Sequence, residues 1–133
     1  MTSEYGIVIA VTGSRRLSLT DDEVEAIVIA AVGTSDIYRL CNGGQRGIDA
    51  SFRRWFNRRV RGHRSLRTFK ADWNEFGRKA GPVRNQRMID DGADVLIAIP
   101  DDESRGTWDC KARAEEAGMR VHLVEDYLTQ PVL

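Results

Sequence analysis

The sequence predicts a single α/β domain with three layers, in which about five parallel strands lie between helices on both faces. Short apolar segments rich in β-branched residues alternate with segments of helical periodicity, and the connections between them are short. Two of the strand-like segments, within residues 5–11 and 94–100, are continuous apolar runs, as expected of strands that are buried on both faces of a parallel sheet. A chain of 133 residues, 41% of them hydrophobic, suits one core, so we expect residues 1–133 to form one domain.

The first half of the chain contains two predicted strands, each followed by a predicted helix. The strands are expected at residues 5–11 (YGIVIAV) and 36–41 (DIYRLC). The helix of residues 20–32 begins at Thr20, and Glu23 three residues later completes a capping-box pattern. The next helix is predicted by four apolar residues on one helical stripe, Ile48, Phe52, Trp55 and Phe56.

The second half of the chain repeats the alternation. Three more strands are expected at residues 64–71, 94–100 and 120–124, and two more helices at residues 80–94 and 107–118. Pro82 suits the first helical turn, where its missing N–H costs nothing, and Gly92 suits the helix end. Thr107 is the predicted N-cap of the last helix. Residues 72–79, DWNEFGRK, are expected to form a loop.

Composition limits the classes of protein that this chain can represent. No apolar run approaches the roughly 20 residues that a membrane-spanning helix needs. The N-terminal segment lacks the basic start of a signal peptide, so we expect a cytoplasmic protein without membrane partners. Cys41 and Cys110 have neither CxxC nor metal-ligand spacing, and we expect both to be buried, apolar-type side chains. We therefore expect no metal ion and no required cofactor.

Charge is balanced in total but not along the chain. Residues 46–87 contain thirteen Lys and Arg against three acids, whereas residues 88–133 contain four against eleven. Such asymmetry is typical of an anion-binding or nucleic-acid-binding surface, and the alternative is that arginines merely solvate helix faces.

Three predicted loops leave the carboxyl ends of strands, and each contains both glycine and arginine. They are residues 12–16 (TGSRR), 42–49 (NGGQRGID) and 100–107 (PDDESRGT). In an open parallel sheet, ligands bind outside the carboxyl ends of the strands, where helix N-termini favour anions. We therefore expect a phosphate-bearing ligand, the alternative being plain turns. None of the loops is a Walker A or GxGxxG motif, which disfavours a P-loop NTPase or a NAD dehydrogenase.

Four segments, in this order, carry a resemblance to a known group of proteins. VTGSR, NGGQRGIDA, KADWNEFGRKAGPVRNQRMI and GADVLIAIP…RGTWD resemble the YspA-type branch of the SLOG superfamily, from Ile7 to about Val124. This Rossmann-like group also contains the LOG phosphoribohydrolases and the DNA-processing protein DprA. The resemblance implies a Rossmann-like domain that binds a nucleotide or a nucleotide-derived signal, from a bacterial or phage source.

The loops and the resemblance together indicate the binding residues. The predicted phosphate and ligand contacts are Gly13, Ser14, Arg15, Gly43, Gly44, Arg46, Asp49, Arg84, Asn85, Gly106, Thr107 and Asp109. Asp49 either binds the ligand, braces the glycine loop or caps the helix that follows. Trp73 and Phe76 either stack on a base or pack against the rim of the sheet.

An enzymatic role depends on how closely the LOG motifs are kept. LOG enzymes carry Arg-Lys followed after two residues by Met, and here Arg84 and Met88 are kept but Asn85 replaces the lysine. The position of the LOG catalytic glutamate holds Cys110, and the acid, Asp109, stands one residue earlier. Such a shift turns the side chain by about 100° around the helix.

The departure leaves three roles open for Asp109. It stabilises charge on a ribose during N-glycosidic cleavage, or it holds ribose hydroxyls in a binding-only site, or it only favours the helix dipole. The catalytic candidates, for an enzyme only, are Arg84 and Asp109.

Three functions follow, in order of preference. The first is a small nucleotide-binding domain, the second is a phosphoribohydrolase-like N-glycosidase, and the third is DprA-like binding of single-stranded nucleic acid through the basic segment Arg53–Lys70. The oligomeric state is open at this point: LOG enzymes are dimers, and by analogy the helix with Trp55 and Phe56 would supply the interface of a homodimer.

Overall fold

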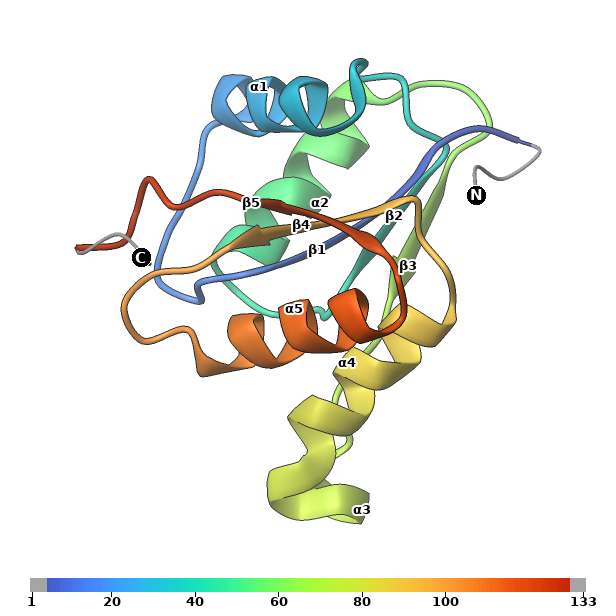
Figure 1. Cartoon of the computed structure of the whole chain (residues 1–133). Coiled ribbons are helices and arrows are strands. Elements are labelled where there is room, and N and C mark those ends of the chain that lie inside the picture. The colour runs from blue at the N-terminus through green and yellow to red at the C-terminus, as the bar shows by residue number, and fades with distance from the viewer. Residues whose placement is uncertain (1–4, 130–133) are drawn as a thin grey trace.

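Five parallel strands form the centre of the structure, a computed structural model that describes residues 5–129 (Figure 1). The strands are β1 (Val8–Gly13), β2 (Arg39–Asn42), β3 (Ser65–Thr68), β4 (Val95–Ile99) and β5 (Arg120–Leu123). Their order in the sheet is β3-β2-β1-β4-β5, and every neighbouring pair is parallel. The predicted three-layer, Rossmann-like α/β fold is therefore confirmed. Residues 1–4 and 130–133 of the predicted domain lie outside the described range.

Helices cover both faces of this sheet. They are α1 (Asp21–Val32), α2 (Ile48–Arg59), α3 (Trp73–Phe76), the 3-10 helix η1 (Gly77–Lys79), α4 (Ala80–Asp90) and α5 (Arg105–Glu116). Helices α1 and α2 lie on one face, and α4 and α5 on the other (Figure 1). The short helix α3 projects beyond the layers, in the lower part of the view. Within residues 5–129, no helix is long and apolar enough to cross a membrane.

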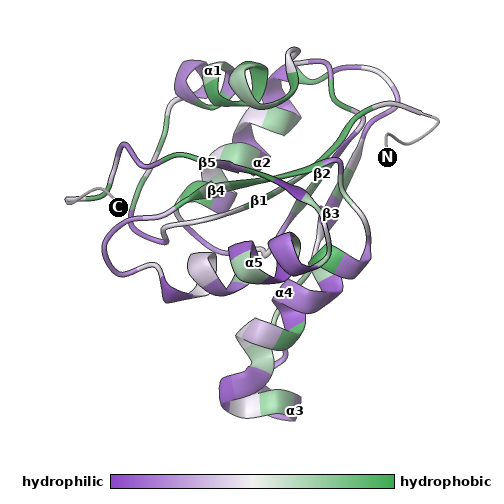
Figure 2. Ribbon diagram, in the orientation of Figure 1, coloured by the Kyte–Doolittle hydropathy of each residue, from purple (hydrophilic) through white to green (hydrophobic). Residues whose placement is uncertain are grey.

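The two faces of the sheet bury two separate groups of side chains. In β1, Ile9 and Val11 enter the larger group under α1 and α2, whereas Val8 and Ala10 enter the smaller group under α4 and α5. This alternation explains why β1 is apolar at every position, as a doubly covered strand must be. The ribbons of β1 and β4 are accordingly mostly hydrophobic in Figure 2.

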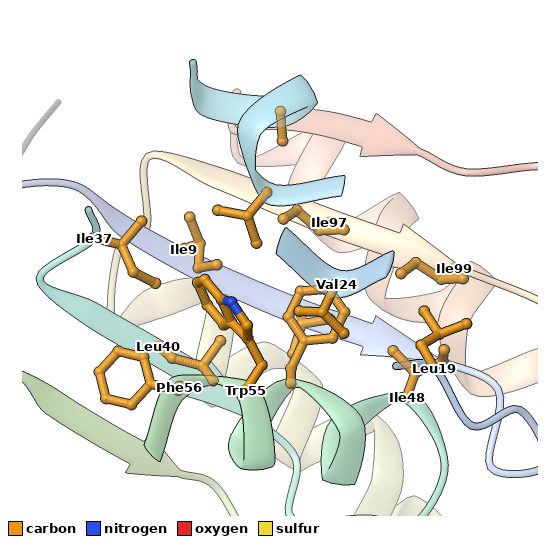
Figure 3. Close-up of a cluster of buried hydrophobic side chains, with 14 of the residues drawn as sticks. Ile9, Leu19, Val24, Ile37, Leu40, Ile48, Trp55, Phe56, Ile97 and Ile99 are labelled. Atoms are coloured by element: carbon orange, nitrogen blue, oxygen red, sulfur yellow. The ribbon is translucent and has the colours of Figure 1, made fainter. Parts of the chain in front are cut away.

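The aromatic residues of α2 belong to the larger core. Trp55 is fully buried and Phe56 is 5% exposed, and both lie against the sheet with Ile9 and Leu40 (Figure 3). Fully burying one large apolar side chain contributes about 1.5–3 kcal/mol. The prediction that Trp55 and Phe56 supply a dimer interface is therefore wrong, because the chain's own core already covers them.

Helix boundaries show where local sequence signals succeeded and failed. The capping box at Thr20 and Glu23 is present, with both reciprocal hydrogen bonds formed. The predicted loop of residues 72–79 is instead α3 and η1, because the Asp72 side chain accepts a hydrogen bond from the Glu75 amide and starts a helical turn. The predicted cap Thr107 is also wrong, since α5 begins two residues earlier, after Ser104.

The strand order fixes where the connecting loops lie. The chain moves from β1 outward to β2 and β3, and then crosses back to β4 on the other side of β1. The loops after β1 and β4 therefore leave neighbouring strands toward opposite faces. This reversal opens a crevice outside the carboxyl ends of the strands, where open α/β sheets bind their ligands.

Candidate functional site

A cavity of about 540 Å³ lies at the carboxyl ends of the central strands. It is lined by the ends of β1 and the loops after β1, β2 and β4, together with α4 and the first turns of α5. Eight of the twelve predicted binding residues line it, namely Gly13, Arg15, Arg46, Arg84, Asn85, Gly106, Thr107 and Asp109. Segments far apart in the sequence are thus brought together at one site.

Arg84 is the most deeply buried cationic group of the cavity. It is 7% exposed, and its guanidinium donates from Nη1 to the Gly43 carbonyl at 2.8 Å and from Nε to Asn85 Oδ1 at 2.9 Å. None of the ion pairs formed among residues 5–129 includes Arg84. Burial lowers its pKa, opposed by the charge of Asp49, but a guanidinium remains protonated at neutral pH. The cavity therefore contains a buried positive charge without an ion-pair partner.

Further arginines stand around this charge. Arg15, Arg46 and Arg105 are exposed, line the cavity and form no ion pair within the described part of the chain. The charge of Arg15 acts on Arg84 and lowers the pKa of Arg84 further. Unpaired arginines that converge on one cavity suit an anion, because the guanidinium fork matches carboxylate and phosphate oxygens.

The acids of the cavity are, in contrast, engaged by other groups. Asp109 Oδ2 accepts hydrogen bonds from Asn85 Nδ2 at 3.0 Å and from Arg113 Nε at 2.9 Å. Burial raises the pKa of Asp109, but these two donors outweigh burial and hold the pKa below its usual value. Asn85 thus connects the guanidinium of Arg84 to an ionised carboxylate, and Asp109 is a carboxylate rather than a proton donor at neutral pH.

Asp101 and Ser14 join the two loops that flank the sheet reversal. The Ser14 hydroxyl donates to Asp101 Oδ2 at 2.5 Å and accepts the amide hydrogen of Arg16 at 2.9 Å. Arg16 also forms ion pairs with Asp101 and Glu103. Burial opposes ionisation of Asp101, yet donors that include Arg16 and Ser14 hold its pKa well below the usual range. Ser14 is 1% exposed and does not line the cavity, so its hydroxyl serves these internal hydrogen bonds.

Gly43, Gly44 and Asp49 also lie outside the cavity lining. A Cβ at Gly43 would lie 2.6 Å from Arg84 Nη1, and one at Gly44 would lie 2.8 Å from Thr68 Cγ2. The carboxylate of Asp49 accepts the amide hydrogens of Gly43 at 3.0 Å and Gln45 at 3.2 Å. These two glycines therefore make room for protein groups, and Asp49 braces the loop rather than capping α2, whose N-cap is Gly47.

Gly47 is a structural requirement that the sequence pattern did not reveal. Its φ is +79°, and a Cβ there would lie 2.3 Å from the Ser14 carbonyl oxygen. Gly13 is equally confined, since its Cβ would lie 2.7 Å from the Ile99 carbonyl oxygen. Both glycines let the loop after β1 pack against its neighbours, α2 for Gly47 and β4 for Gly13, which brings the walls of the cavity together.

The first turn of α5 forms the opposite wall. Gly106 is exposed there, and a Cβ added to it would meet no atom within 4 Å. The N-cap Ser104 makes no side-chain capping bond. The amides of Ser104, Arg105 and Thr107 already donate to backbone carbonyls, so this helix end contributes mainly the partial positive charge of its dipole, which adds to the charge of Arg84.

Several cavity residues were not predicted from the sequence. They are Thr12, Arg16, Gln45, Gly81, Pro82, Asp101, Glu103, Ser104 and Arg105. The position of Asp101 directly after a buried strand was the available signal, since such positions lie at the ligand-binding edge of the sheet. Phe76 does not line the cavity, and Arg87 stacks on its ring instead.

The two cysteines do not line the cavity. Cys41 and Cys110 are free and buried, and burial raises the pKa of each thiol to about 12. Both are thus buried, as predicted from the sequence, and they remain unreactive thiols at neutral pH. Among residues 5–129, no three His, Cys, Asp or Glu side chains gather as a metal site would require.

A phage protein is similar to this chain in sequence. No family model matches the chain. The Gene 61 protein of Mycobacterium phage D29 is 39% identical over 84 residues, which cover 62% of this chain and 67% of the relative. A phage is one of the two sources that the SLOG resemblance predicts. At this identity and coverage, the chain belongs to the same family as the Gene 61 protein of Mycobacterium phage D29.

Proposed function

We propose that this protein binds a small nucleotide or a nucleotide-derived signal, with a phosphate of the ligand at Arg84. The observation that carries the proposal is the buried guanidinium of Arg84, which faces the cavity and has no ion-pair partner among the described residues. The carboxylate of Asp49 offsets the cost of burying this charge only in part, since burial still lowers the pKa of Arg84 on balance, and a buried charge that is not fully compensated destabilises a protein. An anion of the ligand would compensate this charge.

The position of the phosphate differs from the one that the sequence suggested. The space beside Gly13 is occupied by the Ile99 carbonyl, and the Ser14 hydroxyl is bonded to Asp101. The loop after β1 therefore offers a ligand the exposed side chain of Arg15 rather than its backbone. Arg84 supplies a guanidinium, and the N-terminus of α5 supplies the positive end of a helix dipole, and both suit phosphate oxygens. The anion therefore lies between α4 and α5.

Two features favour a nucleotide over a simple anion. The cavity of about 540 Å³ lies in the size range of small-molecule sites, which is roughly 300–1,000 Å³ and far larger than one phosphate needs. The SLOG resemblance, which covers most of the chain, independently implies a nucleotide ligand. Membership of the superfamily remains part of this proposal, as does the absence of a required cofactor.

A thermal-shift and calorimetric panel tests binding. The panel contains the four ribonucleoside 5′-monophosphates, ribose 5-phosphate and inorganic phosphate. We expect at least one nucleotide to raise the Tm and to bind with a Kd that weakens strongly in Gly106→Leu. This variant places a side chain in the open space beside the α5 N-terminus without a steric clash at Cβ. Absence of binding by every nucleotide, with the protein folded, would overturn the proposal.

A second candidate is an N-glycosidase related to the LOG enzymes, and the placement of Asp109 favours it. Cys110 is fully buried, whereas Asp109 lines the cavity as an ionised carboxylate. A carboxylate at that point suits the positive charge that develops on ribose when the glycosidic bond breaks. Release of free base from a nucleoside monophosphate, lost in Asp109→Asn, would support catalysis. Binding without base release would leave Asp109 as a ribose contact.

Binding of nucleic acid receives less support from the arrangement of charges. Much of the basic segment is neutralised by acids from elsewhere in the chain, in the ion pairs Arg58–Asp21, Arg59–Asp22, Arg64–Asp36 and Arg67–Asp91. Paired arginines release fewer counterions from a phosphate backbone. A gel-shift titration with single-stranded DNA at low salt tests this function. Pairing with a second copy and a cytoplasmic location also stay predictions.

A further inference from the structure

Trp73 is an exposed aromatic residue at the edge of the cavity. Its side chain lines the cavity, and the residue is 57% exposed. The other two tryptophans have partners: Trp55 is buried and donates to Glu25, and Lys111 lies over the ring of Trp108. Within residues 5–129, the Trp73 side chain takes part in no hydrogen bond, ring pair or cation–π contact, and only its backbone carbonyl accepts a hydrogen bond, from the Gly77 amide. Since more than half of Trp73 is exposed, packing against the rim of the sheet does not bury this side chain.

The indole lies next to the helix that carries Arg84. A Cβ added to Gly81 would lie 3.9 Å from Trp73 Cη2, so the ring borders the first turn of α4. Arg84 follows Gly81 by three residues and hence lies on the same side of that helix, about one turn further along. Both residues line the cavity. One ligand can therefore reach the indole ring and the guanidinium together.

We propose that Trp73 is the stacking surface for a planar ring of the ligand, whose anionic group lies at Arg84. This inference rests on the proposed function and narrows it to ligands that carry an aromatic base, as opposed to sugar phosphates. An aromatic side chain tolerates any base, because every base has a π face. Trp73 therefore contributes affinity for the base without selecting among purines and pyrimidines by hydrogen bonding.

A comparison of ligands with and without a base measures this contribution. Isothermal titration calorimetry gives Kd for a nucleoside 5′-monophosphate and for ribose 5-phosphate, with wild type, Trp73→Phe and Trp73→Ala. Stacking on one aromatic ring changes affinity by roughly 5- to 150-fold. We expect the nucleotide to bind wild type about tenfold or more tightly than ribose 5-phosphate. Trp73→Ala should remove this preference and leave the Kd of ribose 5-phosphate unchanged, and Trp73→Phe should keep most of it.

Tryptophan fluorescence gives a second measurement, because a bound base would quench Trp73 only if it stacks on the ring, and not if Trp73 had a purely structural role. Trp108→Phe is the background, because Trp108 does not line the cavity and its removal leaves Trp73 and the buried Trp55. A bound base should quench the fluorescence of this variant, and the additional change Trp73→Phe should abolish the quenching. Ribose 5-phosphate should quench neither protein.

The outcomes separate this inference from the proposed function. Equal affinity of wild type for the nucleotide and for ribose 5-phosphate would overturn the role of Trp73 and leave phosphate binding intact. So would an equal loss of both affinities in Trp73→Ala. Failure of both ligands to bind wild type would overturn the proposed function and this inference with it.

Discussion

The guanidinium of Arg84 packs directly against Gly43 and leaves no room for a side chain at position 43. Arg84 Nη1 donates to the Gly43 carbonyl at 2.8 Å, and a Cβ at position 43 would lie 2.6 Å from the same nitrogen. The glycine that the sequence suggested as a ligand contact therefore serves a protein side chain. This contact holds the guanidinium against the loop after β2 and aims it at the cavity.

Gly43→Ala should consequently displace Arg84 without unfolding the protein. The φ of Gly43 is ordinary, so the new methyl group causes a side-chain clash and no backbone strain. We expect a loss of stability of about 1–2 kcal/mol, from the broken charge-assisted hydrogen bond, and a nucleotide affinity at least tenfold weaker. Urea unfolding and calorimetry measure the two effects. Unchanged affinity would show that the position of Arg84 does not matter for binding.

Ser14→Ala should act on stability. Its hydroxyl is the link between Asp101 and the amide hydrogens of Arg16 and Leu17, and it does not line the cavity. Removing it leaves the part-buried amides of Arg16 and Leu17 without this acceptor and takes one donor from Asp101, which costs about 1–3 kcal/mol. Chemical denaturation should show this loss. A variant of unchanged stability that no longer binds nucleotide would instead make Ser14 a direct ligand contact.

Asp49 should make stability depend on pH in a defined window. Burial is the largest influence on this group and raises its pKa from 3.8 to about 6, although the Gln45 and Gly43 amides and nearby arginines oppose the rise. Because the pKa is raised in the folded state, stability is fully present below about pH 3.8 and is lost as the pH rises toward 6. The loss is about 3 kcal/mol in total.

Asp49→Asn tests this window, since an amide oxygen can still accept the two backbone hydrogens. Relative to wild type, we expect the variant to gain stability between about pH 4 and pH 6 and to keep a constant advantage above that range. Unfolding in urea at several pH values from 4.5 to 7.5 (chosen to span roughly this window) gives the difference. A difference that does not change with pH would mean that the folded-state pKa of Asp49 is ordinary.

Gly47→Ala and Gly106→Ala form a matched pair of glycine substitutions. At Gly47 the positive φ and the contact with the Ser14 carbonyl oxygen should cost roughly 3 kcal/mol or more. At Gly106, inside α5 with open space around it, alanine should stabilise the protein by about 0.5–1 kcal/mol. Thermal and urea unfolding compare both with wild type. Equal effects would show that the loop after β1 does not pack against Gly47 as described.

The sequence predicted the fold because the signals for its core are local and repeated. Apolar strand segments, a capping box at Thr20 and the stripe from Ile48 to Phe56 each suffice to place an element. The signal failed at residues 72–79, where one Asp72 capping bond starts a helix too short to show periodicity. Thr107 has the residue type of a cap, but the chain turns into α5 earlier and buries it.

The candidate site was predicted in outline and not in detail. Loops at the carboxyl ends of strands do meet, so residues such as Arg15, Arg84 and Asp109 line one cavity. Contacts between loops decided the rest, and no spacing in the sequence reports that Ser14 bonds to Asp101 or that Gly43 accommodates Arg84. A glycine needed for a ligand and a glycine needed for a neighbouring side chain look the same in a sequence.

The central claim is that the buried charge of Arg84 binds the phosphate of a nucleotide. Its most direct test is calorimetric titration of a nucleoside 5′-monophosphate into wild type, Arg84→Met and the control Arg61→Met, an exposed arginine outside the cavity. Methionine removes the charge and keeps an apolar stem of similar length. We predict at least a tenfold loss of affinity for Arg84→Met and wild-type affinity for Arg61→Met. Wild-type affinity in a folded Arg84→Met protein would contradict the claim.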